Sequence, residues 1–523
     1  MRHLLPPILA CVLARGAFAQ LPRTAPERTN YHETTRYDEA LRLLQAADRA
    51  STRVHLTQFG YSLEGRPLPL VVVGAAAATS EAVRRTGRLR VFIQANIHAG
   101  EVEGKEAMLQ LVRELAQGRH ARWLDSLVLL IAPIYNADGN ERVLLTNRPL
   151  QDGPLGGMGQ RPNAQGLDLN RDHTKLESPE ARSLVALFNA YDPHVVIDLH
   201  TTNGSHHGYH LTYSPPLHPG TDSALVRFLR ESLLPRVTER IRRRDGWEYF
   251  YYGNVPGGAG VSTSIERGWY TFDHRPRFNN NYVGLRNRLA ILSEAYAYLS
   301  FADRIRATYR FVQEVLDALR ASASEVRALT EAADRGSVVG SRLPLRAEYR
   351  RGDTLDILMG AVDTVRNPYS GQRILRRRDE TRTERMPDFS SFEGREWEVA
   401  PAAYLIPPTL EAVVARLEAH GISVGRLEAP LVTTLERFRV DSTWTAPREF
   451  QGHRERTVRG EWESVLDTVP AGFRVVRLDQ PLGRLAFYLL EPRSDDGLLT
   501  WNFLDEQLAG ARYYPIVRTR TLR

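Results

Sequence analysis

Residues 88–115 read RLRVFIQANIHAGEVEGKEAMLQLVREL and join two different patterns. The first eight residues are mostly apolar and include the β-branched Val91 and Ile93, which is typical of a buried strand. From residue 104 onwards the apolar positions recur at helical spacing. A short turn rich in small residues separates the two. The stretch therefore predicts a strand, a turn and a helix in direct succession, which is the repeating unit of α/β domains.

The same succession continues along the chain. Further strands are predicted at residues 127–134, 194–199 and 289–292, and helices at 178–188, 221–243 and 303–319. This alternation predicts an α/β fold with a mixed, largely parallel central sheet flanked by helices. From about residue 346 the sequence is rich in Arg, Glu, Pro and short strands, with a strand–helix unit at 402–421 and only strands and turns expected at 473–502. We therefore expect a smaller β-rich or α+β C-terminal domain.

Length and composition limit the organisation of the chain. Its 523 residues exceed what one hydrophobic core usually organises. We expect an export segment at 1–19, a main α/β domain at 20–340 and an accessory domain of unknown role at 341–523. The net charge of +7 comes from scattered basic residues, so nothing in it indicates a nucleic-acid partner.

The N-terminus has the layout of a cleaved signal peptide. Arg2 precedes an apolar run at residues 4–13, and small residues including Ala19 follow. Cleavage after Ala19 predicts a periplasmic or extracellular protein without a transmembrane anchor; the alternative is a lipoprotein attached through Cys11. Because Cys11 is the single cysteine of the chain, the mature protein would have no thiol, which excludes thiol catalysis and cysteine-ligated zinc.

Polar residues fall where the predicted strands end. His98 follows the first strand, Asn136 the second, His200 ends the third and Glu294 lies just past the last. Ligands of open α/β sheets bind outside the carboxyl ends of the strands. Asp198 and His200 are costly to bury at the end of an apolar strand unless they are paired or bind a metal. We therefore expect a functional site at this edge.

The motifs that carry these residues form an ordered set. H-x-x-E stands at 98–101, N-x-D-G at 136–139, R-x-N-A-x-G-x-D-L-N-R at 161–171 and D-L-H at 198–200, followed by a late Glu at 294. An H-x-x-E pair alone arises often by chance, but the whole set is specific. Over residues 31–319 the chain resembles the zinc carboxypeptidase family, the carboxypeptidase A-like metallopeptidases.

The resemblance implies a metal site. In it, His98, Glu101 and His200 hold one Zn²⁺ ion and leave one coordination position open. Asp168 matches the family's acidic residue that orients the imidazole of His98. A turn-forming aspartate is the alternative for Asp168.

The resemblance also implies how substrate is held. Asn170 and Arg171 match the pair that grips the free C-terminal carboxylate, and an arginine fork suits that group. Arg161 matches the arginine that stabilises the oxyanion, with Arg148 as the alternative. The substrate-capping tyrosine matches Tyr282, with Tyr270 as the alternative.

Glu294 matches the family's general base, because it follows an apolar strand; Glu266 is the competing candidate. The resemblance thus implies a secreted zinc metallocarboxypeptidase, a hydrolase that acts on peptide or protein C-termini. The alternatives are a catalytically silent or weakly active peptide-binding protein of the same fold and an amidase that acts on cell-wall peptides.

Overall fold

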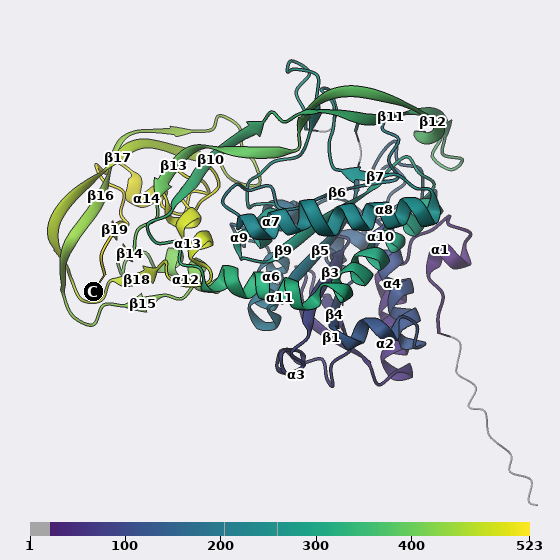
Figure 1. Ribbon diagram of the computed structural model, residues 1–523, viewed down its shortest axis with the longest axis horizontal. Coiled ribbons are helices and arrows are strands. Elements are labelled where there is room, and N and C mark those ends of the chain that lie inside the picture. The colour runs from purple at the N-terminus through teal and green to yellow at the C-terminus, as the bar shows by residue number, and fades with distance from the viewer. Residues whose placement is uncertain (1–20, 203, 259, 523) are drawn as a thin grey trace, which may run out of the picture.

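The computed structural model describes residues 21–202, 204–258 and 260–522 (Figure 1). The predicted signal peptide and Cys11 lie outside these residues. An eight-stranded sheet forms the centre. In spatial order its strands are β1 (Val54–Tyr61), β2 (Pro67–Val73), β4 (Leu127–Ala132), β3 (Leu89–Ala95), β5 (Val195–Thr202), β9 (Leu289–Tyr296), β6 (Leu211–Ser214) and β7 (Tyr249–Tyr251).

The four strands β4, β3, β5 and β9 run parallel to one another, and antiparallel pairs join β4 to β2 and β9 to β6. This confirms the predicted mixed, largely parallel sheet. Alternate residues of a strand point to opposite faces. In β3, Val91 and Ile93 pack into one hydrophobic core, whereas Phe92 packs into a second core on the other face. Both faces of the sheet are therefore covered, as buried parallel strands require.

Helices cover the two faces unequally. The first core is closed by α2 (Tyr37–Ala50), α4 (Glu103–Ala116), α8 (Leu234–Asp245), α10 (Phe301–Ala321) and α11 (Ala323–Arg335). The second core contains α6 (Pro179–Tyr191), α9 (Asn279–Leu285) and two helices of the C-terminal region, α12 (Glu411–Ala419) and α13 (Gly483–Leu490). The short helices are α1 (Ala25–Arg28), α3 (Ser80–Arg85), α5 (Ala137–Glu141), α7 (Ser223–Arg227) and α14 (Asp505–Leu508).

The C-terminal region is rich in β-structure. It begins with β10 (Arg342–Arg350), β11 (Thr354–Arg366), β12 (Arg373–Phe389) and β13 (Ser391–Val399). A six-stranded sheet follows, in the order β15 (Gly425–Arg426), β18 (Arg474–Arg477), β14 (Ala403–Ile406), β19 (Val517–Thr519), β16 (Leu431–Thr445) and β17 (Arg456–Val469). The hairpin of β11 and β12 runs along the α/β part in Figure 1, and β12 pairs with β8 (Trp269–Tyr270).

The C-terminal region and the α/β part share one core. Tyr282 of α9 belongs to the same buried cluster as Tyr404, Leu417 and Phe487. The buried Arg277 side chain also crosses between the two parts, where its Nε donates to Asp496 at 2.8 Å. The two predicted domains are thus packed together through apolar surface and a buried ion pair.

Three predicted segments differ from the structure. The fourth strand runs to Tyr296, so Glu294 lies inside β9 instead of past its end. The helix expected at 221–243 is divided by a π-helical turn over residues 228–233. The segment 473–502, expected to hold only strands and turns, contains α13, whose residues are buried almost all round. A short run of buried residues cannot be told from a buried strand by its pattern alone.

Among the described residues, none of the helices combines the length and the apolar character needed to cross a membrane.

Candidate active site

His98 and Glu101 lie in the turn between β3 and α4, as the sequence predicts. The backbone N–H of Glu101 donates to the His98 carbonyl at 2.9 Å, which turns both side chains towards the same side. Gly100 makes this turn fit. A Cβ atom there would lie 2.7 Å from Cδ of Arg148 and 2.8 Å from the carbonyl oxygen of Gly159, so a larger residue would displace the turn.

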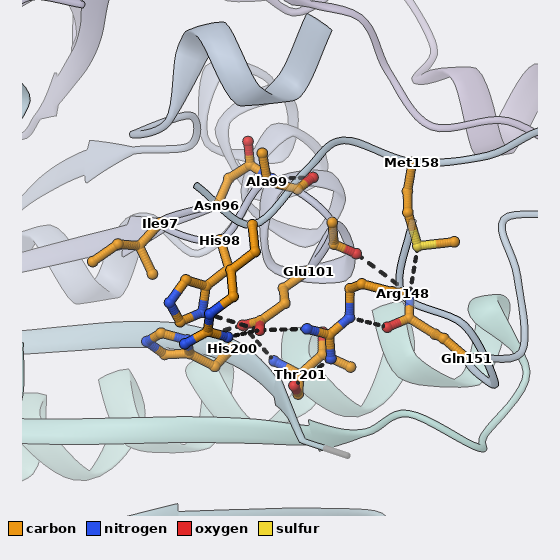
Figure 2. Close-up of polar contacts among 12 residues, drawn as sticks. Asn96, Ile97, His98, Ala99, Glu101, Arg148, Gln151, Met158, His200 and Thr201 are labelled. Atoms are coloured by element: carbon orange, nitrogen blue, oxygen red, sulfur yellow. Dashed lines mark hydrogen bonds and ion pairs between the residues drawn. The ribbon is translucent and has the colours of Figure 1, made fainter. Parts of the chain in front are cut away.

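His200, near the end of β5, completes a cluster with these two residues. Nδ1 of His98 lies 3.0 Å from one carboxylate oxygen of Glu101, and Nδ1 of His200 lies 2.9 Å from the other. The candidate ligand atoms of the three residues all lie within 4.8 Å of one another. Figure 2 shows both imidazole rings on one side of the Glu101 carboxylate. Two residues of one turn and a third from a neighbouring strand therefore meet at a single point.

Each imidazole also contacts a second carboxylate, through the ring nitrogen that does not face Glu101. Nε2 of His98 lies 3.0 Å from Asp168, and Nε2 of His200 lies 2.9 Å from Asp198. Carboxylates in this position fix the tautomer and the orientation of a metal-binding histidine. Both Nδ1 atoms are thereby left to face Glu101 and the space between the rings.

The cluster favours positive charge at its centre. Burial raises the pKa of Glu101, but charge interactions with His98 and Arg148 outweigh burial and hold that pKa well below its usual range. Burial lowers the pKa of His200, but Asp198 and Glu101 raise it well above its usual range. A divalent cation would supply the same charge in place of the imidazole protons. Because two imidazoles and one carboxylate are a frequent catalytic zinc set, the residues present fit a zinc ion.

A cavity of about 710 Å³ opens over this cluster. Its lining includes the three cluster residues and four further candidates from the sequence, Arg161, Asn170, Arg171 and Glu294. The C-terminal region also contributes to the lining, through Ala347, Glu348, Tyr349, Phe392, Phe450 and Asp495. The cavity is therefore built by both parts of the chain.

Glu294 faces this cavity from β9. Burial raises the pKa of its carboxyl to about 8, and the Glu101 carboxylate adds to this, against the opposing effect of His200. Its Oε2 atom is buried without a hydrogen-bond partner within the described part of the chain. A buried carboxylate with a free oxygen and a pKa in the neutral range suits proton transfer. Glu266 instead lies exposed, pairs with Arg351 at 2.9 Å and does not line the cavity.

The turn at residues 168–171 places three of the predicted side chains. Asp168 caps it by accepting from the backbone N–H of Asn170 at 2.9 Å. Arg161 donates to Oδ2 of Asp168 at 3.0 and 2.8 Å and keeps part of its guanidinium towards the cavity. Arg171 packs its guanidinium 3.8 Å from the ring centre of Phe278. Two arginines are thus held at the cavity by a carboxylate and by an aromatic face.

The alternative oxyanion arginine, Arg148, has another position. It donates to Glu101 at 2.7 Å, to the Thr201 carbonyl at 2.8 Å and to Gln151 at 2.7 Å. In Figure 2 it lies on the opposite side of the Glu101 carboxylate from the imidazole rings. It is not among the residues that line the cavity, so the geometry favours Arg161 for contact with substrate.

The position of Tyr282 corrects one prediction. Its side chain is fully buried in the second core, and its hydroxyl bonds Nδ1 of His420 at 2.7 Å, away from the cavity lining. Its alternative, Tyr270, does not line the cavity either. The tyrosines that do are Tyr252 and Tyr349; neither stands in a motif, so no sequence pattern points to them. A capping role for Tyr282 therefore does not fit its position in the structure.

Part of the chain is similar in sequence to known carboxypeptidases. Residues 41–231 match the family model described as zinc carboxypeptidase. "Carboxypeptidase 2" of Trichophyton tonsurans is 25% identical over 476 residues, covering 87% of this chain and 81% of that protein. "Carboxypeptidase D" of Mus musculus is 32% identical over 180 residues, covering 30% of this chain and 13% of that protein.

Among solved structures, a metallo-carboxypeptidase from Burkholderia cenocepacia aligns with a TM-score of 0.40 at 16% identity, over 55% of this chain and 70% of its own. A putative carboxypeptidase A from Shewanella denitrificans aligns with a TM-score of 0.40 at 19% identity, over 55% of this chain and 69% of its own. The family match spans His98, Glu101, Asp168, Asn170, Arg171 and His200. Over residues 41–231 the chain is therefore similar to the zinc carboxypeptidase family.

Proposed function

We propose that the protein is a zinc-dependent metallocarboxypeptidase that hydrolyses the last peptide bond of peptides or proteins with a free C-terminal carboxylate. The observation that supports this most is the meeting of His98, Glu101 and His200 in a cavity that also contains Glu294 and Arg171. A metal site, a base and a carboxylate-binding arginine are the three groups that such a reaction needs.

His98, Glu101 and His200 would hold the ion, which when bound polarises the scissile carbonyl and acidifies a water molecule. Arg171 and Asn170 would orient the peptide by its terminal carboxylate. Glu294 would take the proton of the attacking water and later deliver it to the departing amine. Arg161 would donate to the oxygen on which negative charge develops, and charge-assisted donors are strong in a buried site.

The terminal carboxylate gives the sharpest test. The mature protein is incubated with a peptide library in two forms, with free and with amidated C-termini, each with and without a chelator. We expect single residues to be lost from the free form only, and only without chelator. Cleavage inside the chains, or equal cleavage of amidated peptides, would contradict the proposal.

A variant locates the carboxylate contact. Arg171→Ala should raise KM for free-acid peptides by about 100-fold, because a buried carboxylate loses its charged partner. Arg335→Ala, which changes an exposed arginine at the end of α11 outside the cavity lining, serves as the matched control. An unchanged KM in Arg171→Ala would assign the carboxylate to another cation.

The silent peptide-binding alternative predicts that peptides bind but remain intact in the zinc-loaded protein. If the protein is an amidase that acts on cell-wall peptides, it should release amino acids from wall peptides faster than from the peptides of the library. When wall peptides are added to the peptide library, one substrate panel separates the three functions.

Export is part of the proposal. A signal peptide at residues 1–19 would deliver the protein to the periplasm or the medium, and mass spectrometry of the mature N-terminus tests this. Gln20 as the first residue fits cleavage after Ala19, whereas a lipid-modified Cys11 fits the lipoprotein alternative.

A further inference from the structure

The loop of residues 446–455, which joins β16 to β17, carries a tight turn at its tip. Phe450 and His453 exchange backbone hydrogen bonds at 2.7 and 3.1 Å. The two residues between them, Gln451 and Gly452, have φ values of 53° and 80°. A two-residue hairpin with both central residues at positive φ is a well-defined turn, so the tip has a fixed shape.

This tip reaches the active-site turn of the α/β part. Oε1 of Gln451 accepts from the backbone N–H of Asp168 at 2.8 Å, across 283 positions of sequence. Asp168 in turn contacts His98 and Arg161 through its carboxylate and caps the turn that carries Asn170. A single bond from the C-terminal region therefore acts on the residue that orients a candidate metal ligand and two candidate substrate contacts.

Other contacts hold the tip against this turn. Nε2 of His453 lies 2.8 Å from Glu177, and its Nδ1 lies 3.1 Å from Asn502. The ring of Phe450 lies 6.4 Å from that of Trp501, and the guanidinium of Arg277 lies 5.4 Å from the centre of the Phe450 ring. Contacts on both flanks of Gln451 mean that the tip is docked as a unit.

Phe450 also meets the cavity directly. It lines the cavity together with Arg171 and Phe278, and 38% of its surface is exposed. A large apolar side chain at a cavity rim leaves part of its surface in contact with water. When an apolar group of a ligand covers that surface, its burial favours binding. Its position fits contact with a peptide side chain.

We propose that the tip Phe450–Gln451 completes the substrate site: Gln451 positions the turn at residues 168–171, and Phe450 forms an apolar wall that favours peptides with an aromatic residue at or next to the C-terminus. The proposal deepens the proposed function and rests on it for the identity of the ligand. It assigns to the C-terminal region a direct part in recognition.

Gln451 is tested with two variants whose side chains are similar in length to glutamine. Gln451→Met removes the acceptor and keeps the shape, whereas Gln451→Glu keeps an acceptor oxygen. Zinc affinity is measured by competition with a chromophoric chelator. We expect Gln451→Met to weaken zinc binding by about tenfold, in the range seen when support of a ligating histidine is lost, and Gln451→Glu to restore most of it. Thermal unfolding of the metal-free variants shows whether the fold is intact.

Phe450 is tested by peptide binding in the Glu294→Gln background, where turnover does not interfere. Calorimetry compares peptides that end in Phe-Phe with peptides that end in Ala-Ala. Phe450→Ala should raise Kd about tenfold for the aromatic peptide and leave the alanine peptide within twofold, because about 1.4 kcal/mol of apolar contact corresponds to tenfold. Arg448→Ala, exposed in the same loop, is the matched control.

The results separate this inference from the proposed function. Wild-type zinc affinity in Gln451→Met, or equal effects of Phe450→Ala on both peptides, would overturn the inference while the enzyme remains a carboxypeptidase. If the wild-type protein neither binds nor cleaves any free-acid peptide, the proposed function fails and the role of Phe450 fails with it. The chelator competition decides the positioning role of Gln451 in every case.

Discussion

His200 and Glu294 are register partners on the adjacent parallel strands β5 and β9. Partners in register project their side chains to the same face, so the candidate base lies one strand away from a candidate metal ligand. The spacing is fixed by the pairing of β5 with β9, two strands whose residues are almost all buried. Rigid strands are suited to hold groups whose relative position must not change.

Glu294→Gln separates metal binding from turnover. The substitution keeps the size of the side chain but removes the proton-accepting oxygen, so kcat should fall about 10²- to 10⁴-fold, the usual contribution of a general base. Zinc content, measured by atomic absorption, should stay at the wild-type level. Glu266→Gln is the control and should have wild-type kcat. Retained turnover in Glu294→Gln would mean that another group is the base.

The pH dependence of the metal-free protein reports on Glu294. Its pKa in the fold is about 8, against a usual value of 4.5, because burial disfavours the charged form. The stabilising effect of the protonated carboxyl is complete below pH 4.5 and is lost as the pH rises through 8. Urea unfolding of metal-free wild type from pH 5 to 9 should therefore show a steeper loss of stability than Glu294→Gln. Parallel curves for the two proteins would rule out a raised pKa of Glu294 in the folded state.

Asp168→Asn and Asp198→Asn test the support of the two imidazoles. Each substitution weakens the partner of one Nε2 atom, so zinc affinity should fall about 10- to 100-fold in each variant. Chelator competition provides the measurement. Asp441→Asn, an exposed residue of the C-terminal sheet, should bind zinc as the wild type does. Wild-type affinity in both site variants would show that the histidines do not need these carboxylates.

Truncation after residue 340 tests the predicted division into domains. Removal of residues 341–523 would expose the second core on α6 and α9 and leave Tyr282 and Arg277 without His420 and Asp496. A contiguous apolar surface that is exposed in this way favours aggregation. We expect residues 20–340 to be insoluble or to unfold without a cooperative transition in calorimetry. A soluble, cooperatively folding fragment would establish an independent α/β domain.

Local sequence patterns were sufficient for the elements that carry the candidate metal site. The apolar run, the small-residue turn and the helical period at residues 88–115 correspond to β3, the turn with His98 and Glu101, and α4. Each of these patterns arises within a few residues, because strand and helix periods are local properties of the backbone. The same holds for Ser178, which caps α6 by accepting from Ala181.

The tertiary structure alone decided how the cavity is closed. Phe450, Tyr349 and Asp495 reach it from the C-terminal region, whose sequence carries no metal or nucleophile motif. Gln451 of the same region contacts Asp168 across 283 positions. Likewise, Tyr282 stands in a polar segment that suggests a pocket, yet its side chain packs into the core beneath the C-terminal region. Contacts between distant residues leave no period or spacing in the sequence, because they depend on how whole elements pack. The sequence by itself therefore determined the four parallel strands β3, β4, β5 and β9 and the motif residues, whereas packing determined the other strands of the sheet and which side chains face the cavity.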